Sequence, residues 1–206
     1  LLNFGLPLAL RMMAVGAVLY AMQRFGALSW LLKNARKMKG MAAMILIFSA
    51  FSVFGTAAGI EFAGLVINFR DLGAMMAGLL GGPLVGMFVG LIGGAYRYSM
   101  GGWTATACFA ATVSAGLVSG LLSRYWKGRI DYRKAVFTGV LAESMHLLLF
   151  LPLLQQGGST EVVLETIRAL FLPMTVVNAL GLFLLVYIMD KEKRMRNSNS
   201  SKEDRC

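Results

Sequence analysis

The sequence is dominated by long apolar stretches that contain almost no charged residue. A helix needs about 20 apolar residues to cross a hydrocarbon core about 30 Å thick, so each such stretch is a candidate span. Six stretches approach or exceed this length: residues 1–23, 40–60, 72–95, 98–123, 135–154 and 169–189. Their only charged side chains are Arg11 and Glu143. The pattern predicts an all-α membrane protein, in which residues 1–23 form a retained helix rather than a cleaved signal peptide.

Composition and charge are consistent with a lipid environment. The 206 residues are 57% hydrophobic and 15% charged, and the mean hydropathy of +0.67 exceeds that of ordinary soluble domains. The net charge of +10 could suggest nucleic acid, but that function needs a basic stripe on a folded soluble surface. We therefore predict a lipid bilayer as partner and no nucleic acid.

The distribution of Lys and Arg predicts the topology. Sixteen of the twenty lie in residues 24–39, 124–134 and 190–206, and cytoplasmic loops collect such residues. Three apolar stretches separate the first two clusters, so one of these stretches must not cross the membrane. We expect a bacterial inner-membrane protein with its N-terminus outside and its C-terminus in the cytoplasm.

The stretch 72–95 is the one that does not cross, because Gly81, Gly82 and Pro83 interrupt it at its middle. We predict a helical hairpin whose halves reach about mid-membrane and return, with the turn buried among neighbouring helices. The fold is then five full transmembrane helices plus this Gly-Pro-broken hairpin. Glycines at every fourth position from Gly78 to Gly94 allow close helix packing, which is also their simplest explanation.

Two arginines flank the hairpin and are the first candidates for a binding site. Closing the hairpin would bring Arg70 and Arg97 to one face near the outer membrane boundary. A converging pair of guanidinium groups suits a small carboxylate or phosphate. The alternative is that both side chains extend to the membrane–water interface, with Asp71 as a partner for one of them.

Polar residues inside the other stretches are weaker candidates. Glu143 and His146 lie three residues apart on one helix face, where a charge is costly. Glu143 could stay protonated, pair with His146 or meet an arginine, and Asn178 could donate a hydrogen bond across helices. The sequence has no metal-ligand spacing, phosphate-binding loop or nucleophile elbow, so we predict no catalytic residue, metal or cofactor, and no enzyme activity in this chain.

Three segments resemble the LytS-type five-transmembrane receptor family: Asn68-Phe69-Arg70, Gly78 to Gly86, and Gly93 to Gly102. The resemblance covers residues 40–189. That family supplies the membrane sensor of bacterial histidine kinases, and some members bind pyruvate from outside through two arginines and a cysteine. The resemblance implies a ligand site, and its candidate residues here are Arg70, Arg97, Cys108, Asn68, Ser99, Thr112, Glu143 and Asn178. One departure is Ala111, which stands where such members have a serine.

The resemblance implies a receptor for a small, pyruvate-like carboxylate, acting as a homodimer in a two-component pathway with a cytoplasmic kinase and response regulator. Residues 1–189 would be the sensor domain, with 1–23 as an extra helix and 40–189 as its core. Residues 190–206 would be a polar tail, and the output domain, a histidine kinase or diguanylate cyclase, would lie outside this chain. The hairpin is also similar to substrate-binding subunits of energy-coupling transporters, so a capture or transport subunit is the alternative; a scaffold without ligand is a third.

Overall fold

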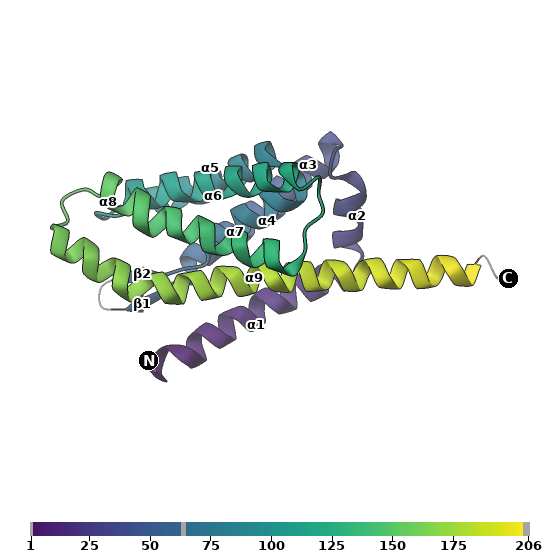
Figure 1. The fold of residues 1–206 in the computed structure, drawn as a ribbon, viewed down its shortest axis with the longest axis horizontal. Helices are drawn as coiled ribbons and strands as arrows, with labels where there is room; N and C mark the ends of the chain where they lie inside the picture. Colours follow the sequence, from purple (N-terminus) through teal and green to yellow (C-terminus); the bar gives the residue numbers. More distant parts are fainter. Residues whose placement is uncertain (1, 63–64, 204–206) are drawn as a thin grey trace.

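The computed structural model describes residues 2–62 and 65–203, almost all of them helical (Figure 1). The helices are α1 (Leu2–Arg24), α2 (Ala27–Asn34), α3 (Met38–Ala57), α4 (Arg70–Gly81), α5 (Pro83–Ser99), α6 (Ala105–Tyr125), α7 (Tyr132–Ser144), the π-helical η1 (Met145–Phe150), α8 (Leu151–Leu154) and α9 (Thr160–Glu203). Two short antiparallel strands, β1 (Ile60–Phe62) and β2 (Leu65–Ile67), precede α4.

Four helical segments in the described part of the chain are long and apolar enough to cross a membrane. They are α3, α6, the run Tyr132–Leu154 formed by α7, η1 and α8, and Thr160–Arg194 of α9. The segments Met13–Arg24 and Ala27–Asn34 meet at a bend of 74° and count as a fifth span if they are taken together. The predicted all-α membrane fold is therefore confirmed. Its third crossing begins at Ala105 rather than residue 98, because residues 98–104 complete α5 and the turn after it.

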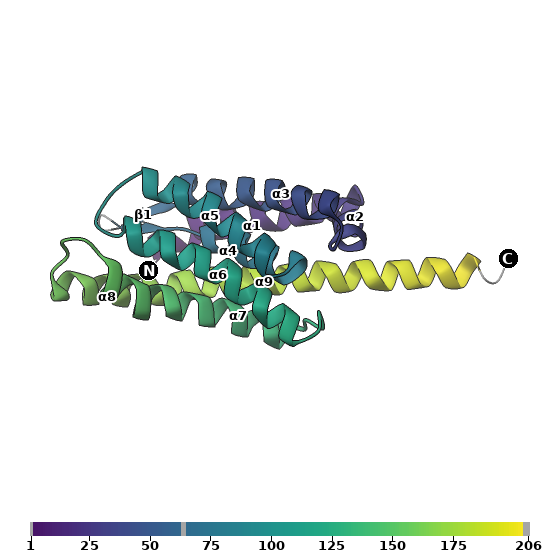
Figure 2. The ribbon, with the colours of Figure 1, turned by 90° about the horizontal axis from the view of Figure 1, so that it is seen from above.

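Helix α4 lies at the centre of the bundle. It packs against α3, α5, α6, α7 and α9, and all residues from Arg70 to Leu79 are buried. Figure 2 shows α3 and α5 along one side of the molecule and α7 with α9 along the other. A helix buried on all faces has no contact with lipid, so polar groups at its start must find partners within the protein.

The predicted hairpin is formed by α4 and α5, which run antiparallel. Gly93 of α5 lies beside Arg70, and Gly86 beside Gly78. The turn is at Gly82, whose φ of +88° suits glycine, and Pro83 begins α5 at its first position.

The predicted depth of that turn is wrong. The turn does not lie buried at mid-membrane: Gly82 is only half-buried and lies against Gly120, near the end of α6. The reason is that small residues continue along α6 to Gly120, so close packing of the hairpin extends to the end of that helix.

All three basic clusters lie at one end of the molecule. The α2–α3 corner, the α6–α7 turn and the extension of α9 are together on the right of Figure 1, opposite the β1–β2 hairpin and the α8–α9 loop. Helix α9 continues without a break to Glu203 and projects beyond the bundle. The predicted polar tail from residue 190 is therefore helical as far as the description reaches.

Candidate functional site

A small cavity of about 140 Å³ lies at the end of the bundle opposite the basic clusters, and we call it the Arg97 cavity. Its polar lining residues are Asn68, Arg97, Thr104, Cys108, His146 and Thr166. The rest of the wall is mostly apolar, with Trp103, Leu147 and Met174 among its members. The volume is below the range of about 300–1,000 Å³ that is usual for drug-sized ligands, so it suits a molecule of few atoms.

Arg97 is held at the rim of this cavity by its own loop. Its Nη1 donates to the Gly101 carbonyl at 2.7 Å, and its Nη2 donates to Thr104 Oγ1 at 2.9 Å. Gly101 and Gly102 have φ values of +73° and +92°, which let the chain curl back over the guanidinium. In the described residues no carboxylate forms an ion pair with Arg97, so a positive charge faces the cavity without a fixed counter-charge.

Arg70 is deeper and already paired. Its side chain is fully buried, its Nε lies 3.3 Å from Asp71 Oδ1, and the same Nε donates to Thr112 Oγ1 at 2.6 Å. Its two Nη atoms have no hydrogen-bond partner among the described residues. Arg70 does not line the Arg97 cavity.

The prediction that the two arginines meet near the outer boundary is therefore wrong for Arg70. The partner of Arg70 is Thr112 on α6, and the partner of Arg97 is Thr104, which directly precedes α6. Eight residues of helix correspond to about 12 Å of depth. The reason is that β1 and β2 carry the chain back into the bundle before α4 begins. Cys108 lies between the two levels on α6 and lines the Arg97 cavity.

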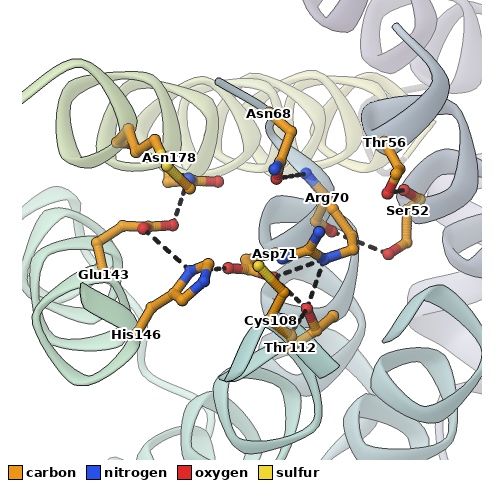
Figure 3. Close-up of polar contacts among 11 residues, drawn as sticks. Ser52, Thr56, Asn68, Arg70, Asp71, Cys108, Thr112, Glu143, His146 and Asn178 are labelled. Atoms are coloured by element: carbon orange, nitrogen blue, oxygen red, sulfur yellow. Dashed lines mark hydrogen bonds and ion pairs between the residues drawn. The ribbon is translucent and has the colours of Figure 1, made fainter. Parts of the chain in front are cut away.

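A chain of polar contacts leads from Arg70 to α9 (Figure 3). Asp71 Oδ2 lies 2.9 Å from His146 Nδ1, which lies 3.6 Å from Glu143 Oε2. Glu143 Oε1 accepts a hydrogen bond of 2.6 Å from Asn178 Nδ2. The chain joins α4, η1, α7 and α9, and His146 belongs to both this chain and the cavity wall. His146 stands in the π-helical turn, a distortion often found at functional sites.

The same cluster has the spacing of a metal site, but its charges favour an ion-pair network. Ligand atoms of Asp71, Glu143 and His146 all lie within 4.8 Å of one another. The Arg70 guanidinium against Asp71 would repel a bound cation. Arg70 and His146 are the two groups of this cluster that can carry a positive charge, and each contacts a carboxylate, as buried charges require.

The structure brings seven of the eight candidate residues into this region. Arg97, Cys108 and Asn68 line the cavity, while Arg70, Thr112, Glu143 and Asn178 belong to the network behind it. Ser99 is a correction: it is exposed at the end of α5, and its hydroxyl donates to the Tyr96 carbonyl, away from the cavity.

The sequence interpretation underestimated Asp71 and His146. Asp71 was considered only as a partner for an interfacial arginine, and His146 only as a partner for Glu143. The available signal was that His146 lies inside an apolar stretch and Asp71 directly before one, where an ionisable group needs a partner.

The Glu143–Asn178 contact ties α7 to α9, and its removal is expected to destabilise the protein. Asn178→Ala leaves Glu143 Oε1 without its donor, at an expected cost of about 1–3 kcal/mol. Thr175→Ala, one turn away on α9, is the matched control, because the Thr175 hydroxyl has no partner among the described residues. Thermal unfolding in detergent measures both variants, and equal losses of stability would contradict the assignment.

A bundle of four or five spans around a buried charged network and a small cavity defines a multi-span membrane protein with a ligand-sized polar site. Residues 25–192 match the family model described as the five-transmembrane receptor of the LYT type, 5TMR of 5TMR-LYT. The chain belongs to this family. No solved structure matches the chain.

Curated relatives agree with this membership. The chain is 36% identical over 159 residues to the sensor histidine kinase BtsS of Escherichia coli K12, which covers 73% of this chain and 27% of that protein. It is 31% identical over 188 residues to the sensor protein LytS of Bacillus subtilis, covering 80% and 31%. It is 30% identical over 174 residues to the sensor histidine kinase YpdA of E. coli K12, covering 82% and 30%. The chain thus spans less than a third of the length of these relatives.

Proposed function

We propose that this chain is the ligand-binding membrane region of a bacterial sensor histidine kinase, and that it binds a small, pyruvate-like carboxylate in the Arg97 cavity. The observation that carries the proposal is a guanidinium without a fixed counter-charge at the rim of a cavity of about 140 Å³. An anion of few atoms fits both the charge and the volume. Asn68 and Cys108 supply weaker polar groups on the same wall.

The orientation follows from the basic end of the molecule. The three Lys- and Arg-rich clusters lie together, and the positive-inside rule assigns such an end to the cytoplasm. The Arg97 cavity then opens toward the outer face of the inner membrane, with the N-terminus outside. A ligand would reach it without crossing the bilayer.

Signal transfer is proposed to run through α9. His146 lines the cavity and connects through Glu143 to Asn178 on α9, which continues as one helix to Glu203. A ligand that binds one state of His146 more tightly than another shifts the equilibrium between two positions of α9. The size of that shift equals the difference in binding free energy between the two states. An output domain attached to α9, in a homodimer signalling to a response regulator, completes the proposed pathway. The names of the relatives favour a kinase over a diguanylate cyclase as that domain.

Ala111 bears on ligand identity. It is 2% exposed and follows Cys108 by one turn on α6. A serine there would add a hydroxyl near Cys108, but Ala111 does not line the Arg97 cavity, so its methyl group changes the surroundings of Cys108 and not a direct contact with the ligand. We propose the carboxylate group as the common feature and pyruvate as the first compound to test.

Arg97→Gln is expected to weaken carboxylate binding by about 10- to 150-fold. This change in Kd corresponds to the free energy of one charge-assisted hydrogen bond. Isothermal titration of the detergent-solubilised chain with pyruvate, lactate and acetate measures this. Arg168→Gln is the matched control, because Arg168 is exposed on α9 and does not line the cavity. Unchanged affinity in the Arg97 variant, or no binding of any of these acids to the unaltered chain, would overturn the proposal.

A further inference from the structure

A second and larger cavity lies at the opposite, basic end of the bundle. This cleft has a volume of about 720 Å³ and shares no lining residue with the Arg97 cavity. Its walls come from the α2–α3 corner, the α4–α5 turn, the end of α6 and the α6–α7 turn, with Met189 from α9. We call it the basic cleft.

Three cations line the basic cleft, and no carboxylate does. They are Arg36, Arg124 and Lys127, and none forms an ion pair in the described part of the chain. Two neighbouring lysines are engaged elsewhere: Lys134 contacts Asp131 and the Trp126 ring, and Lys191 lies over the Tyr20 ring. Three like charges from two separate elements around one hollow favour an anion between them.

The backbone of the cleft also favours an anion. Helix α5 begins at Pro83 with no side-chain cap from Gly82, and both residues line the cleft. The free N–H groups at the start of a 17-residue helix carry partial positive charge.

The turn that follows α6 holds one of the three cations at the cleft. Lys127 has a φ of +54°, a left-handed conformation that is uncommon for a residue other than glycine. It is held there by the bond from the Gly128 N–H to the Ser123 carbonyl, 2.8 Å, which closes α6. The turn that terminates α6 therefore also places Lys127 at the cleft.

The remaining wall is apolar and decides what kind of anion fits. Leu32, Leu80, Leu84 and Ile130 line the cleft between the charged groups. A free phosphate gains nothing from such a wall, whereas a phospholipid buries part of its acyl chains there.

We infer that the basic cleft is a binding site for one anionic phospholipid of the leaflet on this side. Arg36, Arg124 and Lys127 bind the phosphate headgroup, and the apolar wall holds the start of the acyl chains. By the positive-inside rule that leaflet is the cytoplasmic one, where anionic lipids attract basic residues near the surface. A lipid here bridges three turns of the bundle and contacts Met189, so its occupancy bears on the position of α9. The site is independent of the ligand proposed for the Arg97 cavity.

The test titrates the 206-residue chain in a non-ionic detergent with phosphatidylglycerol, phosphatidylcholine and inorganic phosphate, and native mass spectrometry counts the bound molecules. We expect one phosphatidylglycerol to bind in preference to phosphatidylcholine. The double variant Arg124→Gln/Lys127→Gln should bind it roughly 30-fold more weakly, since each basic residue near anionic lipid is worth about a factor of five. Arg36→Gln, on a different element, should weaken it about fivefold.

The matched control is Arg129→Gln/Arg133→Gln, which removes the same charge from the same cluster at two exposed positions outside the cleft. It should retain nearly full affinity. If the control variant loses as much affinity for phosphatidylglycerol, the lipid is held by general attraction to the basic surface, and the inference of a specific site is overturned. If inorganic phosphate displaces phosphatidylglycerol at the same concentration, the cleft is a site for free anions. If phosphatidylcholine binds as tightly as phosphatidylglycerol, the basic side chains do not select the lipid. Either result overturns the inference.

Discussion

Asp71→Ala is expected to destabilise the protein by about 3–5 kcal/mol, because it leaves a buried arginine without its counter-charge. The Asp71 and Arg70 side chains are almost fully buried, and Arg70 Nε lies 3.3 Å from Asp71 Oδ1. Asp71 also faces His146 at 2.9 Å and accepts a hydrogen bond from Thr112 at 2.6 Å. Denaturant-induced or thermal unfolding in detergent measures the loss.

A double variant separates the charge effect from simple loss of packing. Arg70→Met with Asp71→Leu removes both charges and keeps most of the apolar volume, so it should recover much of the stability that Asp71→Ala loses. An Asp71→Ala protein as stable as the unaltered chain would show that Arg70 does not depend on this carboxylate. Because Arg70 lies outside the Arg97 cavity, the double variant also tests whether ligand binding needs it.

Gly116→Ala is the second large effect, with an expected cost of about 3 kcal/mol from overpacking. A Cβ at Gly116 would lie 2.1 Å from the Gly86 carbonyl oxygen, and a Cβ at Gly86 would lie 2.2 Å from the Gly116 carbonyl oxygen. Both obstacles are backbone atoms, so α5 and α6 must separate to admit the methyl group. Separation moves α6, which carries Cys108 and Thr112.

The control for this effect is Gly16→Ala on α1. A Cβ at Gly16 meets nothing within 4 Å, so alanine there is expected to be neutral or to stabilise the helix by about 0.5–1 kcal/mol. Thermal unfolding midpoints of the two variants, measured in the same detergent, should move in opposite directions or differ clearly. Similar shifts would mean that the α5–α6 contact is looser than the geometry indicates.

Most of the fold could be predicted from the sequence, because bilayer thickness sets the length of an apolar span. The stretches 40–60, 135–154 and 169–189 correspond to α3, to α7 with η1 and α8, and to part of α9. The break at Gly82 and Pro83 was also predictable from backbone chemistry. Its depth was not, because depth depends on how far the glycines of α4, α5 and α6 allow these helices to pack.

The candidate site was predictable only in part. Resemblance pointed to Arg97, Cys108 and Asn68, which line the cavity, but it also pointed to the exposed Ser99. The contact between His146 and Asp71 was missed, since a histidine three residues from a glutamate does not reveal that a carboxylate from α4 faces it.

The sequence by itself determined that this chain is a helical membrane protein, where its helices break, and which end carries the basic residues. These features depend on local hydrophobicity, backbone chemistry and charge along the chain. Only the tertiary structure decided that Arg70 is paired in the interior while Arg97 faces a cavity, and that Arg36, Arg124 and Lys127 surround one cleft. The reason is that each of these arrangements joins residues from separate helices, and their distances are set by packing of the bundle.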